Sequence, residues 1–333
     1  MIRMHLYPAQ EPFSHEWLDV GDGHAVYIEQ CGRPDGLPVI FLHGGPGSGC
    51  SPRHRCLFDP GRYRIVLMDQ RGSGRSRPRG RTLANTTSHL VQDLEAVRLH
   101  LGIGRWLVFG GSWGASLALA YAARHPDACQ ALLLRGAFLT GREELIWFFA
   151  EAGKLLPQAH AQLRALPGFA DHQEGADLVD WYLQAVASAD LQHAWVAVQH
   201  WMRWEAALTQ PWASDFRQPF EARADMDDDA RMQIDKYRLQ AHYLQNECFL
   251  GDAALIACAG QLGDLPGLIV HGTQDLVCRP HSAWRLSRAW PGSRLQWVDQ
   301  AGHSPFEPSM ARALIDATDA FAAHGHFNGS TPR

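Results

Sequence analysis

The sequence has no long apolar run. No segment approaches the ~20 consecutive apolar residues of a membrane-spanning helix, and the opening residues MIRMHLYPAQEPF lack the apolar core of a secretory signal. Lysine is scarce, occurring only at Lys154 and Lys236. The formal net charge is −5, whereas a nucleic-acid-binding domain needs a basic stripe. We therefore expect no membrane partner and no nucleic-acid partner.

Cysteine pairing and metal-ligand spacing are also missing. The seven cysteines form an odd, scattered set without a CxxC motif, which favours reduced thiols in a cytoplasmic protein over a disulfide framework. His193 and His200 show no metal-ligand pattern, and the acidic run at 225–229 lacks the glycine and distal glutamate of a calcium loop. We expect neither a metal nor a cofactor.

What is present is an alternation of short apolar runs and turns. Runs such as LPVIFL, YRIVLM, WLVF and ALLL alternate with helical spacing over residues 1–140, which predicts a mostly parallel sheet with helices on both faces. Residues 141–262 instead read as helices rich in tryptophan, and strand-like runs return with GLIV and RLQWV. We predict a discontinuous α/β core (1–140 and 263–325), a helical cap (141–262) over the active site, and a disordered tail (326–333).

One serine lies at a predicted strand-to-helix junction. Gly110, Ser112 and Gly114 satisfy G-x-S-x-G directly after the run WLVF, and WGASLALAYAARHP follows with helical spacing. A sharp turn at this point lifts the serine hydroxyl above the sheet, and flanking side chains would clash there. We interpret Ser112 as a catalytic nucleophile on a nucleophile elbow.

A base and an orienting acid follow in the required chain order. Asp275 comes after the strand-like run LIVHG, and His303 lies in the loop after the next predicted strand. This order, Ser then Asp then His, is that of α/β hydrolases. Asp299 is the competing acid, but its position four residues before His303 favours a role in shaping that loop.

The segment HGGPG (43–47) supplies a glycine loop after another predicted strand. The backbone N–H groups of Gly45 and Trp113 are the predicted oxyanion donors. His43 is interpreted as structural, and Cys278 as a wall of the pocket.

These motifs resemble the proline iminopeptidases (prolyl aminopeptidases), serine peptidases of the α/β-hydrolase fold, over almost the whole chain. The resemblance implies release of an N-terminal proline from a small peptide or aminoacyl substrate, in the cytoplasm, without metal or cofactor. It leaves the oligomeric state open. The segments that carry it are HGGPG, DQRGSGRS, NTTSHLVQDLE, RWLVFGGSWG, LALAYAARHP, LRGAFL, VHGTQDLVC and AGHSPFEP.

The same resemblance implies the substrate-binding residues. The family binds the free amino group through two glutamates, and here WMRWE provides Glu205, whereas RLQAHYL places Gln240 at the second position. Phe138 and Phe149 are implied as further substrate contacts, with Phe149 standing where the family often has an aromatic hydroxyl. Losing one charge predicts weakened or broadened N-terminal specificity. Glu247, seven residues after Gln240, is a weaker candidate for compensation.

Two alternatives remain open at the level of sequence. The first is an esterase or amidase for small amine-bearing or uncharged acyl compounds, which would use the same nucleophile, base and acid. The second is a non-catalytic ligand-binding protein on a hydrolase scaffold, although an intact set of three catalytic residues argues against it.

Overall fold

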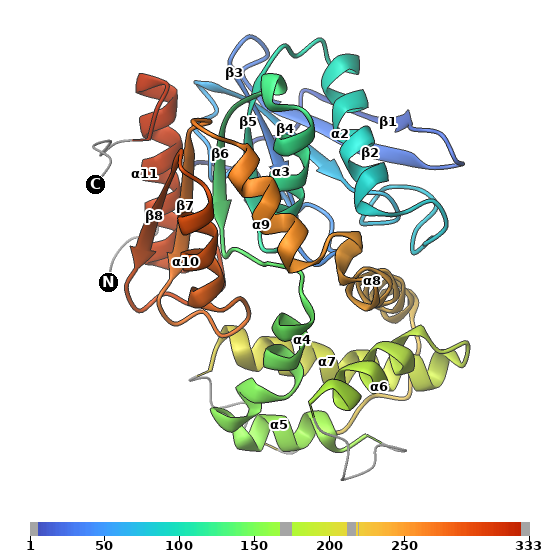
Figure 1. The fold of residues 1–333 in the computed structure, drawn as a ribbon. Coiled ribbons are helices and arrows are strands. Elements are labelled where there is room, and N and C mark those ends of the chain that lie inside the picture. The colour runs from blue at the N-terminus through green and yellow to red at the C-terminus, as the bar shows by residue number, and fades with distance from the viewer. Residues whose placement is uncertain (1–5, 167–174, 212–217, 219, 328–333) are drawn as a thin grey trace.

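A computed structural model describes residues 6–166, 175–211, 218 and 220–327. Its centre is an eight-stranded sheet in the order β1-β2-β4-β3-β5-β6-β7-β8 (Figure 1). β1 pairs antiparallel with β2, and β2 pairs antiparallel with β4. The remaining neighbours in this order, β4-β3-β5-β6-β7-β8, pair parallel. The strands are β1 (Ser14–Asp19), β2 (Ala25–Gly32), β3 (Leu37–Leu42), β4 (Tyr63–Asp69), β5 (Trp106–Gly111), β6 (Cys129–Arg135), β7 (Gly267–Gly272) and β8 (Ser293–Val298).

Helices cover both faces of this sheet, which confirms the predicted fold class. The central strands β5 and β7 are buried along their whole length, as expected for parallel strands that lie between two helical layers. One face packs against α2 (Thr87–His100), α3 (Trp113–Arg124), α9 (Gly251–Gln261) and α10 (Pro280–Ala289). The other face packs against α11 (Pro308–His324). The short helix α1 (Pro52–Arg55) contacts the sheet through His54, whose ring stacks on Phe41 of β3.

A second, helical layer lies apart from the sheet (Figure 1), and part of it lines a cavity together with Ser112. It consists of α4 (Arg142–Phe149), α5 (Pro157–Arg164), α6 (Ala176–Ala187), α7 (Leu191–Thr209) and α8 (Asp228–Gln245). Short 3₁₀ turns occur at η1 (Pro126–Ala128), η2 (Glu151–Lys154) and η4 (Glu247–Phe249).

The range predicted for the cap includes one helix that packs elsewhere. α9 contacts α3 and α10 on the face of the sheet, and its buried Leu255 and Ala259 belong to the cluster that those helices share. The absence of strand-like runs in 141–262 could not separate a cap helix from a helix that covers the sheet. The helices that lie apart from the sheet end with α8.

The C-terminal end of the described chain is packed. Phe327 is buried and its ring lies against Phe321 of α11, so the first residues of the predicted disordered tail are ordered by an aromatic contact. Residues 328–333 of that tail lie outside the described residues.

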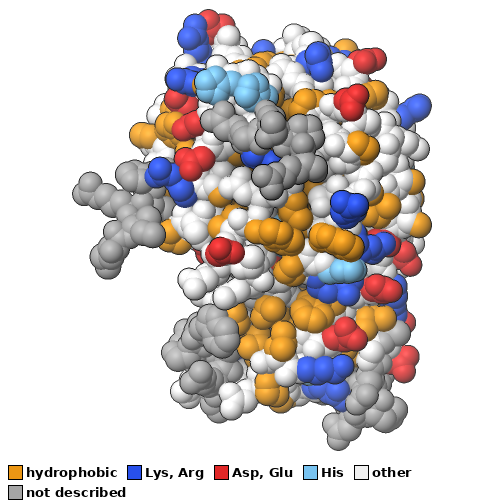
Figure 2. Space-filling model, turned by 60° about the vertical axis from the view of Figure 1, so that its left-hand side comes forward, with side chains coloured by type: hydrophobic (Ala, Val, Ile, Leu, Met, Phe, Trp, Pro, Cys, Tyr) orange, Lys and Arg blue, Asp and Glu red, His pale blue; other side chains and the backbone are white. Residues whose placement is uncertain are grey.

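The outer surface offers no single-sign field on the face shown in Figure 2, where acidic and basic side chains are interspersed. Among the described residues, no helix is both long enough and apolar enough to span a bilayer.

Candidate active site

The serine turn after β5 has strained backbone geometry. Ser112 has φ 56° and ψ −124°, a conformation that non-glycine residues rarely adopt. A Cβ on Gly110 would lie 2.1 Å from the carbonyl oxygen of Gly114, and one on Gly114 would lie 2.1 Å from that of Leu42. The backbone N–H of Ser112 donates to the Arg135 carbonyl at 2.8 Å. The G-x-S-x-G pattern is therefore required by close backbone packing.

His303 and Asp275 lie together at the same edge of the sheet. The His303 Nδ1 atom is 2.7 Å from the Asp275 Oδ2 atom. The other carboxylate oxygen accepts the N–H groups of Val277 and Cys278, each at 2.9 Å. Burial opposes ionisation of Asp275, but His303 and these hydrogen bonds outweigh it and hold its pKa below the usual value. The competing Asp299 is exposed.

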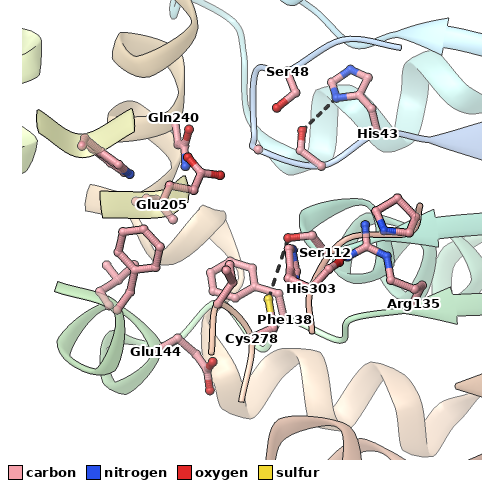
Figure 3. A pocket seen from close by; sticks show the side chains of 18 of the residues that line it. His43, Ser48, Ser112, Arg135, Phe138, Glu144, Glu205, Gln240, Cys278 and His303 are labelled. Carbon is pink, nitrogen blue, oxygen red and sulfur yellow. Dashed lines mark hydrogen bonds between the residues drawn. The ribbon is translucent and has the colours of Figure 1, made fainter. Parts of the chain in front are cut away.

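Ser112 and His303 both lie in the described part of the chain, and the Ser112 hydroxyl makes no hydrogen bond to His303. Its Oγ atom lies 3.8 Å from the Cys278 Sγ atom, while the His303 Nε2 atom lies 3.3 Å from Nη1 of Arg135. Hydrogen bonds of catalytic groups are often long or misaligned in free enzymes and tighten when substrate binds. Figure 3 shows Ser112 and His303 next to each other in the cavity.

Cys278 is a wall of the cavity, close to the serine. Burial, followed by the charge of Asp275, raises the pKa of its thiol well above the ordinary value. A thiol held protonated is a poor nucleophile, so the structure places a neutral group beside Ser112.

The glycine loop after β3 lies directly against the serine. A Cβ on Gly44 would be 3.2 Å from the Ser112 Cβ atom, and Gly44 and Gly45 both line the cavity. Gly45 has φ +112°. Trp113 is the first residue of α3, where backbone N–H groups have no acceptor within the helix. The loop and the helix start are thus the local sources of N–H donors.

His43 supports this loop from below. Its Nε2 atom accepts the N–H of Gln70 at 3.0 Å, and its Nδ1 atom is 2.9 Å from the Gly44 carbonyl oxygen. Burial lowers the pKa of His43, so the ring is a neutral part of the scaffold.

The cavity above Ser112 has a volume of about 250 Å³ and is shared by core and cap. α7 and α8 contribute Glu205 and Gln240, whose side chains lie next to each other on the wall opposite His43 in Figure 3. Phe138 and Phe149 line the apolar part of the cavity. The other apolar side chains in the lining are Leu145, Phe148, Trp201, Leu244, Val277, Pro305 and Phe306.

The two polar side chains that the cap contributes to the cavity, Glu205 and Gln240, differ in their hydrogen bonds. Glu205 accepts a hydrogen bond from the Tyr237 hydroxyl at 2.9 Å, which fixes one carboxylate oxygen. Gln240 is 7% exposed, and its Oε1 atom has no hydrogen-bond partner. Glu247 is exposed and is not part of the cavity lining, so the structure does not place it where it could compensate for Gln240.

Two charged residues of the cavity wall were missed by sequence reasoning. Arg135 is buried, and it donates through Nη1 to the His303 carbonyl oxygen at 2.8 Å. Glu144 is 3% exposed and accepts from Arg279 at 2.7 Å and from the Ser282 hydroxyl at 2.6 Å. Arg135 lies in LRGAFL, one of the segments that carry the family resemblance, and Glu144 begins ELIWFF. An apolar context does not show which way a charged side chain turns.

The residues that the structure describes form no cluster of histidine, cysteine, aspartate or glutamate able to hold a metal ion. His200 donates through Nδ1 to the Gln162 carbonyl oxygen at 2.7 Å and packs edge-on against Phe220, and His193 is exposed. Neither histidine lines the cavity.

Comparison with known proteins gives a consistent result. Residues 38–309 match the family model of the alpha/beta hydrolase fold. The chain is 45% identical over 320 residues to the proline iminopeptidase of Xanthomonas citri, covering 95% of this chain and 99% of that protein. It is 40% identical over 320 residues to the proline iminopeptidase of Arabidopsis thaliana, covering 96% and 82% respectively.

Solved structures share the fold at low identity. The proline iminopeptidase of Mycobacterium smegmatis matches with a TM-score of 0.59 and 20% identity, over 94% of this chain and 100% of that chain. The esterase EaEST of Exiguobacterium antarcticum matches with a TM-score of 0.61 and 19% identity, over 93% and 100%.

Proposed function

The chain belongs to the proline iminopeptidases of the α/β-hydrolase fold, and from this premise we propose how its own residues release an N-terminal proline. Ser112 attacks the carbonyl of the first residue, and His303 takes the hydroxyl proton. His303 then delivers that proton to the leaving nitrogen. Water hydrolyses the resulting acyl-enzyme by the same steps in reverse.

Asp275 holds the base in the required tautomer. Its Oδ2 atom lies 2.7 Å from Nδ1 of His303, so Nδ1 carries the proton and Nε2 is left to act as acceptor. The depressed pKa of Asp275 keeps this carboxylate ionised near neutral pH. The N–H groups of Gly45 and Trp113 stabilise the oxyanion of the tetrahedral intermediate.

In this proposal, the cap recognises the N-terminus of the substrate. Glu205 binds the secondary ammonium of proline, and Gln240 contributes a dipole where the family uses a second full charge. An ammonium–carboxylate hydrogen bond has two charged partners and is stronger than an ammonium–amide bond, which has one, by roughly 1–1.5 kcal/mol. Recognition of the free amine is therefore weaker or broader than with two carboxylates. Phe138 and Phe149 pack against the pyrrolidine ring.

The observation that carries this proposal is one shared cavity that contains Ser112 and His303 at the strand ends and Glu205 on the cap. The test is hydrolysis of prolyl-glycine by the purified protein, together with stoichiometric labelling of Ser112 by a fluorophosphonate. Ser112→Ala should lose both. The control is Ser116→Ala, which should keep both: it removes the hydroxyl of a buried serine of α3 that donates to the Phe138 carbonyl. Unlabelled but folded protein would instead indicate a ligand-binding protein on a hydrolase scaffold.

The uncharged Gln240 also favours a second candidate, an esterase or amidase for small acyl compounds. A panel of prolyl amides, their N-acetyl counterparts and simple esters separates the two. A higher kcat/KM for N-acetyl or ester substrates than for free-amine substrates would favour the second candidate. A cytoplasmic location stays a prediction from the scattered cysteines.

A further inference from the structure

Under the proposed function, the amino group and the leaving group of the substrate lie at different walls of the cavity. Glu205 and Gln240 close the side that receives the amino group under the proposed function. The leaving nitrogen must lie beside His303, because that residue protonates it. Pro305 and Phe306 lie two and three residues after His303 in the sequence, and both line the cavity. A leaving peptide therefore starts at these two residues.

A second cavity continues on the far side of Phe306. Phe306 lines both cavities, and the second one is also lined by Arg53, Ser304 and Glu307. Its other described walls come from the end of α7 and from the loops after β7 and β8. Phe306 thus stands between the reacting groups and a groove that opens on the surface.

Arg53 is the cation at this groove. Its guanidinium carbon lies 4.1 Å from the centroid of the Phe306 ring. The adjacent His54, which lines the catalytic cavity, stacks on the same ring at 5.7 Å. Among the described residues Arg53 makes no ion pair, and its side chain is exposed.

The carboxylate in the same groove is already used. Glu307 accepts the Gly302 N–H through Oε2 at 2.8 Å and the Ser304 N–H through Oε1 at 3.2 Å. Both of its carboxylate oxygens therefore accept hydrogen bonds from the backbone of the His303 loop. Arg53 is left with donors that face the groove and no protein anion to receive them.

We propose that Arg53 binds the C-terminal carboxylate of the leaving peptide, so that the enzyme prefers di- and tripeptides with a free C-terminus. This inference rests on the proposed function. One extended residue spans at most ~3.6 Å, so the carboxylate of a one- or two-residue leaving group stays close to Phe306 and the guanidinium above it. Longer peptides carry their carboxylate beyond this cation and gain nothing from it.

The size of the effect follows from exposure. Ion pairs at exposed positions are weak and screened by salt, so the preference for a free carboxylate over the carboxamide should be roughly two- to five-fold at low ionic strength. It should shrink toward one as sodium chloride is raised to about 0.5 M, where the Debye length falls to a few ångströms.

The experiment compares kcat/KM for prolyl-glycyl-glycine and its C-terminal amide. In the native enzyme the carboxylate substrate should be preferred. Arg53→Met keeps an apolar stem on the Phe306 ring and should bring the ratio to about one, while Arg53→Lys should keep part of the preference. The matched control is Arg77→Met, because Arg77 is also exposed and stacks at 4.5 Å on an aromatic ring, that of Trp17, away from both cavities.

Two results would overturn the inference while leaving the proposed function in place. One is equal use of carboxylate and amide by the native enzyme. The other is a parallel loss on both substrates in Arg53→Met, which would mean that Arg53 only supports Phe306. Failure of the native enzyme to cleave either substrate would reject the proposed function itself, and this inference with it.

Discussion

Gln240→Glu is the substitution that most directly tests how the cap recognises its substrate. Gln240 is 7% exposed on α8 and lines the catalytic cavity with Glu205. The change keeps the side-chain shape and adds one negative charge opposite the expected position of the substrate ammonium. The groups that carry out the reaction are not touched.

The magnitude follows from the kind of hydrogen bond that is replaced. The hydrogen bond from the substrate ammonium to the Gln240 amide already has one charged partner, and a carboxylate makes both partners charged. Hydrogen bonds to charged groups contribute about 1.5–3 kcal/mol, and we expect the two bonds to lie toward the lower and upper ends of this range. A gain of roughly 1–1.5 kcal/mol corresponds to roughly 5- to 13-fold in kcat/KM. Repulsion between the new carboxylate and Glu205 destabilises the free enzyme, and a bound cation relieves it. We therefore expect about ten-fold for free-amine substrates, with a lower melting temperature for the unliganded variant.

The assay is kcat/KM for prolyl-glycine amide and its N-acetyl counterpart. Only the free amine should gain, and Glu205→Gln should have the opposite effect by removing the remaining carboxylate. Gln245→Glu is the matched control, because it adds the same charge to an exposed position of the same helix. An equal change for amine and N-acetyl substrates would refute the assignment of position 240 to the amine site, and the natural substrate would have to be sought outside N-terminal proline peptides.

Four further outcomes are expected. Gly114→Ala should abolish turnover and lower the melting temperature, because its Cβ would lie 2.1 Å from the Leu42 carbonyl oxygen, whereas Gly104→Ala meets nothing within 4 Å and should do neither. Asp275→Asn should lower kcat by roughly 10³- to 10⁴-fold with an unchanged circular dichroism spectrum; a loss under ten-fold would argue that another acid orients His303. Burial lowers the pKa of His54 to about 3, so between about pH 6.5 and 3 the unfolded chain binds a proton that the folded chain does not. The free energy of unfolding, measured by urea titration, should thus fall as pH falls through this window, and it should fall less in His54→Asn. An equal fall in both proteins between pH 7 and pH 5 would contradict this. EDTA should leave kcat/KM unchanged, and a loss restored by zinc would contradict the mechanism.

The inner strands of the parallel part of the sheet could be predicted from sequence because burial on both faces leaves an uninterrupted apolar run. β5 is buried along its whole length and ends at the serine turn, so one signal locates both the strand and the proposed nucleophile. β1 (Ser14–Asp19) carries no such signal. Its residues alternate between half-buried and exposed, as in an edge strand with one face toward solvent, and its place in the sheet depends on pairing with β2.

The residues of the site also differ in whether they could be predicted from the sequence. His303 and Asp275 follow strands in chain order, and the 2.7 Å contact between them was predictable in kind. Arg135 was not, because the last residue of a buried strand gives no sign of whether its side chain turns toward solvent or under the neighbouring loop. The structure shows it buried, with Nη1 on the His303 carbonyl oxygen. Tertiary packing alone determines that direction.

The two parts of the site also differ in how much change they tolerate. At the serine turn, backbone atoms stand where a Cβ would have to go, so almost any substitution of the flanking glycines must displace a strand or a helix start. On α8 the Gln240 side chain contacts the cavity, and its Oε1 atom has no hydrogen-bond partner, so exchanging glutamate and glutamine there breaks no hydrogen bond of that atom. The backbone conformation at Ser112 therefore depends on close packing in which neither flanking glycine can be replaced without displacing its neighbours. The proposed substrate recognition, by contrast, depends on a cap helix, where a single exchange at position 240 changes the charge of the cavity and leaves the sheet intact.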